Sequence, residues 1–126
     1  MLKSLWQFLD LFMHIIHLSA IFFLLVGWAF YETQLPHFVL VWLVFLSWFG
    51  LGLIYGFGYC LMTDVHWRIK DKLGVRPSAN IYVKYMLDKV LPINIDEGLV
   101  DQVSTYVFFA VFAIANYLFL MAFFQP

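Results

Sequence analysis

The stretch LWQFLDLFMHIIHLS, residues 5–19, opens an apolar segment that continues to Phe30. Crossing the hydrocarbon core of a bilayer takes about 20 such residues. The polar side chains in and just before the stretch recur with the period of a helix: Lys3, Gln7, Asp10, His14 and His17. At about 100° per residue they fall in one stripe about 80° wide, and the other faces carry Leu, Ile, Phe and Met. Because charged groups avoid lipid, the stripe predicts a membrane helix with one face turned toward protein or water.

Composition places the rest of the chain in a membrane as well. Of its 126 residues, 64% are hydrophobic and 12% are charged, whereas a soluble domain carries about 25% charged residues. We expect a single membrane domain over 1–126, with three spans at about residues 5–30, 38–60 and 99–124. The first apolar run is longer than the roughly 7–15 residues of a signal-peptide core, so we expect a retained helix rather than a cleaved leader.

The basic residues predict the orientation of the spans. Six of the seven Lys and Arg residues lie in the polar region 63–98, and the seventh is Lys3. Because cytoplasmic loops collect Lys and Arg, the N-terminus and region 63–98 are expected inside the cell and the C-terminus outside. The break between the first two spans is expected at ETQLPH, residues 32–37, where Pro36 opposes helix continuation. A net charge of −1 provides no attraction for nucleic acid.

Two short helices are predicted within the polar region. The first, TDVHWRIKDKLG at 63–74, would end at Gly74. Its apolar side chains recur every four residues and form one face: Val65, Ile69 and Leu73. The second, SANIYVKYMLDKVLP at 78–92, would end before its proline. We expect both helices to lie in the cytoplasmic interface of the membrane. The fold class is therefore an all-α integral membrane protein, with three transmembrane and two interfacial helices.

Polar and small residues in the other spans predict how the helices meet. In the third span, four polar side chains fall within about 120° of one another on a helical wheel: Asp101, Ser104, Thr105 and Asn116. In the second span, small residues four apart, Gly52, Gly56 and Cys60, would let another helix approach closely. The simplest assembly is a three-helix bundle with Asp10, His14 and Asp101 in its interior. Its cytoplasmic rim would hold Cys60, Thr63, Asp64 and His66.

A family resemblance rests on YGFGYCLMTDVHWRIKDKLG, residues 55–74. This stretch resembles small bacterial inner-membrane proteins known as domain-of-unknown-function family 2784. Those proteins have a first helix bearing His near its start and a second helix ending in a Tyr/Trp-x-Cys-x-x-Thr segment. The matching positions here are His14 or His17, Tyr59, Cys60, Thr63, Trp67 and Arg68. Many members have Pro where this chain has Leu61, and Glu where it has His66. The resemblance implies the fold and the membrane location, and it implies no activity.

The ionisable residues yield two sets of candidate ligands. Asp10, His14, His17 and Asp101 are candidates for binding a cofactor, namely haem b, a quinone or a transition metal, or for handling protons. His14 and His17 share one helix face, so they cannot be the two opposite axial ligands of a single haem. The alternative is a structural role, in which these groups bond to polar residues of other helices.

The second set is a metal site at the cytoplasmic rim, formed by Cys60, Asp64 and His66. Zinc favours Cys and His ligands, but the chain has one cysteine and neither C-x-x-C nor H-x-x-x-H. The alternative makes Asp64 a helix cap and His66 a solvated residue of the interface.

Three functions are compatible with these observations. The leading hypothesis is a non-enzymatic inner-membrane protein that acts as a subunit of a larger assembly or as an oligomer, because three aromatic helices would expose large faces to lipid or to partners. The second is a cofactor-binding or proton-handling module built on the Asp/His stripe. The third is a membrane enzyme with its site at the cytoplasmic rim. The expected partners are the lipid bilayer and another membrane protein or a second copy.

Overall fold

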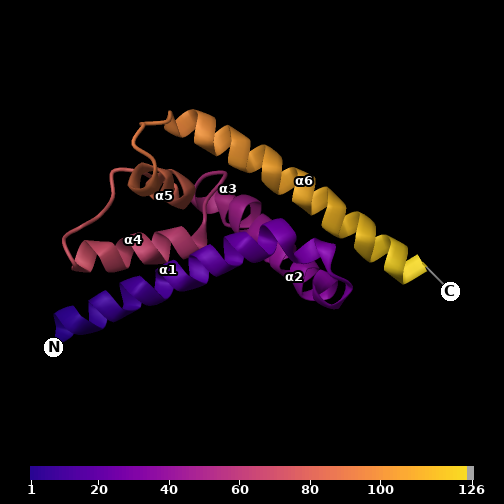
Figure 1. The fold of residues 1–126 in the computed structure, drawn as a ribbon, viewed down its shortest axis with the longest axis horizontal. Coiled ribbons are helices and arrows are strands. Elements are labelled where there is room, and N and C mark those ends of the chain that lie inside the picture. Colours follow the sequence, from indigo (N-terminus) through magenta and orange to yellow (C-terminus); the bar gives the residue numbers. More distant parts are fainter. Residues whose placement is uncertain (125–126) are drawn as a thin grey trace.

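The computed structural model describes residues 1–124, and every regular element in that range is helical (Figure 1). The two longest helices, α1 and α6, run obliquely to each other, and the start of α1 and the end of α6 lie at opposite ends of the long axis. The elements are α1 (Leu2–Val26), two 3₁₀ turns (Gly27–Ala29 and Tyr31–Thr33), α2 (Gln34–Phe45), a π-helical turn (Leu46–Gly50), α3 (Gly52–Tyr55), α4 (Leu61–Lys72), α5 (Tyr82–Val90) and α6 (Glu97–Phe124).

Three helical runs are long and apolar enough to cross a membrane: Leu2–Ala29, Tyr31–Tyr55 and Glu97–Phe124. A run of 28 residues is about 42 Å long, which exceeds the roughly 30 Å of the hydrocarbon core. The second run starts earlier than the sequence suggests. Pro36 lies inside the first turns of α2, where a missing N–H costs little, and the break comes instead at Phe30, whose backbone is extended.

One apolar core joins α2 to α6. It contains Val41 from α2 and Phe108, Val111 and Ala115 from α6. Aromatic pairs extend the contact along both helices, with ring centroids 4.1 Å apart for Phe38 and Phe119 and 5.0 Å apart for Phe45 and Phe112. The end of α1 joins this core, because the His37 ring of α2 bonds through Nε2 to the Leu24 carbonyl oxygen at 2.7 Å.

A second core joins α1 to the polar region. Trp67, Ala79, Tyr82 and Tyr85 are buried together, and Ile21 of α1 packs against them. Helix α4 lies alongside the first half of α1 (Figure 1). Asp10, His14 and His17 of the polar stripe therefore face α4 and α5, whereas Lys3 and Gln7 are exposed. The expected three-helix bundle, with the stripe facing the other two spans, is wrong in this respect.

The predicted apolar face of α4 packs only in part, because Ile69 is buried whereas Val65 is exposed. The other buried residues of the helix are Thr63, His66, Trp67 and Lys70. The reason is the partner surface: α1 presents Asp10 and His14, so α4 turns the side that carries matching donors toward it. The expected end of this helix at Gly74 is confirmed, since Gly74 follows the last turn with φ +72°.

A glycine turn reverses the chain between α3 and α4. Gly56 and Gly58 have φ of +109° and +88°, a region that side chains other than glycine rarely adopt. The Ser47 hydroxyl, in the π-helical turn, accepts the Leu61 N–H at 3.0 Å and donates to the Tyr59 carbonyl oxygen at 2.9 Å. Gly56 therefore ends the second membrane-length run, and a methyl group added there would meet nothing within 4 Å among the described residues 1–124. The predicted close helix contact at Gly56 is not formed.

Candidate functional site

Six polar side chains meet where α1 faces α4 and α5, and we call them the Asp/His cluster. Helix α1 contributes three residues whose spacing of 4 and 3 places them on one face. Helix α4 contributes two residues one turn apart, and α5 contributes a tyrosine from its first turn. The members are Asp10, His14, His17, His66, Lys70 and Tyr82.

Asp10 is the electrostatic centre of the cluster. Its Oδ1 lies 2.8 Å from His66 Nε2 and 3.0 Å from the Lys70 ammonium. The same ammonium lies 3.3 Å from Oδ2. The His66 side chain is 0% exposed and that of Lys70 is 5% exposed, whereas that of Asp10 is 21% exposed. The carboxylate therefore compensates a buried ammonium, a pairing that is costly to break from either side.

The imidazoles of His14 and His66 touch edge to face, with ring centroids 4.4 Å apart. His14 Nδ1 lies 2.9 Å from the Tyr82 hydroxyl, and His14 Nε2 lies 3.9 Å from Asp10 Oδ1. The third imidazole, that of His17, stacks on the Tyr82 ring at 3.8 Å. Tyr82 thus positions two histidines, one through its hydroxyl and one through its ring.

Two ring nitrogens of the cluster, His17 Nδ1 and His66 Nδ1, are buried without a hydrogen-bond partner in the described part of the chain. Because His66 Nε2 faces a carboxylate, we assign the proton of that ring to Nε2, and Nδ1 then keeps a bare lone pair. Burial lowers the pKa of His66, and the bond to Asp10 opposes that shift. Burial also raises the pKa of Tyr82 to about 12, so its hydroxyl keeps its proton.

The pKa of His66 makes fold stability depend on pH. An unfolded histidine titrates near 6.5, and the folded pKa of His66 is lower. Below about pH 6.5 the unfolded chain therefore binds more protons than the folded chain, and stability falls as the pH falls. We expect the thermal midpoint of the detergent-solubilised chain, in chelator, to decrease from pH 7.5 to 5.5. His66→Gln should decrease less, and an equal decrease in both proteins would contradict the assignment.

Three of the four residues proposed for a cofactor lie in the cluster: Asp10, His14 and His17. The fourth, Asp101, is exposed on α6 and does not join them. Among residues 1–124, three His, Cys, Asp or Glu side chains bring ligand atoms within 4.8 Å of one another at Asp10, His14 and His66. Two imidazoles and a carboxylate suit a divalent transition-metal ion.

The three residues proposed for a metal at the cytoplasmic rim, Cys60, Asp64 and His66, have different surroundings. His66 turns toward Asp10, and Cys60 precedes the first turn of α4. Asp64 accepts a hydrogen bond of 2.5 Å from the Tyr59 hydroxyl and another of 3.3 Å from Arg68 Nε. The Tyr59 bond lowers the pKa of Asp64, and the same bond raises the pKa of Tyr59 to about 12.

Sequence reasoning missed Lys70 and Tyr82. Lys70 had a readable signal, because it follows His66 by one helical turn and so shares its face. Tyr82 had none: it is separated from His14 by 68 positions, and only the return of the chain after α4 brings the two together.

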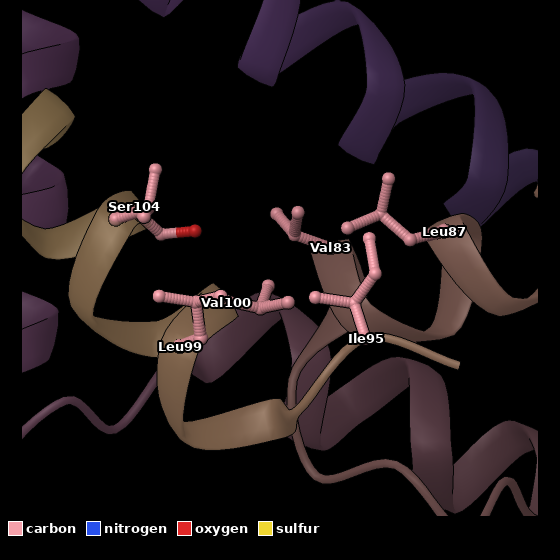
Figure 2. A pocket seen from close by; sticks show the side chains of 7 residues that line it. Val83, Leu87, Ile95, Leu99, Val100 and Ser104 are labelled. Carbon is pink, nitrogen blue, oxygen red and sulfur yellow. The ribbon is translucent and has the colours of Figure 1, made fainter. Parts of the chain in front are cut away.

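A hollow of about 210 Å³ lies apart from the cluster, between α5 and the start of α6 (Figure 2). Its lining is aliphatic except for one hydroxyl: Val83, Leu87, Ile95, Leu99, Val100, Val103 and Ser104. Figure 2 shows these side chains converging from α5, the following loop and α6. The residues that line this hollow carry no ionisable group.

A family model described as "Protein of Unknown function (DUF2784)" matches residues 7–120. The matched range includes every member of the Asp/His cluster. No curated protein and no solved structure matches the chain significantly.

Proposed function

We propose that this chain, which belongs to the DUF2784 family, is a small non-enzymatic subunit of a larger assembly in the bacterial cytoplasmic membrane. The observation that carries this proposal is how little the three membrane-length helices cover one another. Only 6%, 11% and 17% of the residues in their most apolar windows are buried within the chain. The remaining surface must be covered by lipid or by protein.

The outward surfaces include residues that lipid satisfies poorly. Asp101 and Tyr106 are exposed in the first turns of α6, and the Trp42 indole of α2 donates to the Asn116 side-chain oxygen at 3.1 Å in an exposed position. Polar side chains on membrane helices usually face other helices or water. A second membrane protein or a second copy, seated along α2 and α6, would cover them.

The Asp/His cluster has a structural part in this proposal. Its ion pair and hydrogen bonds attach α4 and α5 to α1, so the polar region 63–98 becomes a rigid surface at one end of the protein. We place that surface in the cytoplasm, because it carries six of the seven basic residues. The two short helices would then lie at the inner membrane interface.

Crosslinking in intact membranes tests the subunit role. A photoreactive phenylalanine replaces Tyr117 on the outward side of α6 in one variant and the buried Phe108 in another. We expect a discrete protein adduct from position 117 and none from position 108. Adducts to lipid alone at position 117, together with a monomer in mild detergent, would contradict the proposal.

Cysteine labelling tests the orientation. In a Cys60→Ser background, Glu32→Cys marks the turn between the first two runs and Asp88→Cys marks α5. We expect a membrane-impermeant maleimide to label position 32 in intact cells, and position 88 only after the cells are opened. The reverse pattern would place the polar region outside.

A further inference from the structure

We propose that Asp10, His14 and His66 bind a divalent transition-metal ion such as Zn²⁺ between α1 and α4. This site goes beyond the subunit role and does not depend on it. The three ligands come from two helices that the fold already holds together. A bound ion would join α1 and α4 through bonds stronger than the present hydrogen bonds.

The ligand atoms already converge on one point. Asp10 Oδ1 lies 2.8 Å from His66 Nε2 and 3.9 Å from His14 Nε2, and the three ligand atoms lie within 4.8 Å of one another. Zinc binds imidazole nitrogen and carboxylate oxygen at about 2.0–2.2 Å, so the ligand atoms of a tetrahedral site lie about 3.4 Å apart. The ligand atoms therefore lie within about 1.4 Å of the separations that a tetrahedral site requires.

A neighbouring residue already orients one of the ligands. The Tyr82 hydroxyl lies 2.9 Å from His14 Nδ1, the usual position of the partner that holds a metal-binding imidazole. With its proton on Nδ1, His14 presents a free lone pair on Nε2. His66 binds as the other neutral tautomer, with its proton moved from Nε2 to Nδ1. Neither imidazole changes its net charge when the ion binds.

Lys70 is the competitor for this site. Its ammonium lies 3.0 Å from Asp10 Oδ1 and supplies the positive charge that the ion would bring. The same ammonium lies 5.1 Å from the centre of the Tyr85 ring, which offers it a second favourable position. Binding of the ion would therefore shift Lys70 from the carboxylate toward that ring. Three protein ligands leave a fourth position for water, and the 21% exposure of the Asp10 and His14 side chains gives the ion a path.

The test uses the full chain in detergent, with an affinity tag that lacks histidine, after removal of metal by a chelator. Cobalt(II) is titrated while its visible absorption is followed, and Zn²⁺ is then added to compete. We expect one equivalent of Co²⁺ per chain, displaced by one equivalent of Zn²⁺. His14→Gln and His66→Gln should each weaken binding by at least about tenfold.

His37→Gln is the matched control, because His37 is a buried histidine of α2 that bonds to the Leu24 carbonyl oxygen and lies outside the Asp/His cluster. It should bind as the unchanged protein does. Lys70→Met, which removes the charge and keeps an unbranched side chain one atom shorter, should tighten binding by about tenfold or more. Misfolding cannot imitate that gain. Absence of stoichiometric binding, equal loss in His37→Gln, or weaker binding in Lys70→Met would overturn the proposal.

Discussion

Asp10→Asn is expected to destabilise the fold by about 3 kcal/mol. The change leaves the Lys70 ammonium buried without its carboxylate, and removing one partner of a buried ion pair costs about 3–5 kcal/mol. We expect the lower end of that range, because the Asp10 side chain is 21% exposed and water can solvate part of the site. The measurement is thermal or denaturant unfolding of the chain in detergent, followed by the loss of helical circular dichroism.

Two further variants separate the ion pair from a general effect of the substitution. Asp101→Asn changes an exposed aspartate of α6 and should stay within about 0.5 kcal/mol of the unchanged protein. Asp10→Asn combined with Lys70→Met removes both charges and should recover much of the loss, since the two sites are coupled. If the double variant is no more stable than Asp10→Asn alone, the ion pair is not the source of the destabilisation.

Trp67→Ala is expected to cost about 3–5 kcal/mol and to release α5 from α4. The Trp67 indole is 3% exposed, packs against Tyr82 and Tyr85, and donates to the Ala79 carbonyl oxygen at 2.9 Å. Truncating a large buried aromatic side chain loses its apolar burial and leaves a cavity. Because Tyr82 is held by this packing, the contact between Tyr82 and His14 should be lost with it. Protease sensitivity of region 74–82, compared with that of the unchanged chain, measures the release.

Trp67→Phe serves as the control for that prediction. It keeps most of the apolar contact and loses the hydrogen bond to Ala79 together with a small part of the ring, so we expect a cost of about 1–2 kcal/mol. Equal destabilisation by alanine and phenylalanine would mean that the hydrogen bond, rather than the packing, holds α5 in place.

Local periodicity and composition are sufficient to predict the helices of this fold and the polar face of the first one. The long apolar runs indicate three membrane-length helices, and the stripe on α1 indicates that Asp10, His14 and His17 face one surface. These features depend on 3.6 residues per turn and on the cost of exposing backbone and charge to lipid. The membrane-length helices and the stripe each depend on residues close together in the sequence, and the structure contains both.

The partners of the stripe could not be predicted in the same way. Asp101 has the right residue type and a comparable position in its helix, yet it is exposed on α6. Lys70 and Tyr82 lie 60 and 68 positions from their partners in α1. Pairing over such separations depends on the turn at Gly56 and Gly58, which sends α4 back along α1.

The amino-acid sequence by itself determined that this chain forms apolar membrane-length helices and that the first carries a polar, ionisable face. Tertiary structure alone decided that α4 and α5 cover that face, so that His66 and Lys70 meet Asp10. The physical reason is that helix formation follows from interactions within one or two turns. Which polar groups compensate one another in the interior depends on the path of the chain between the helices.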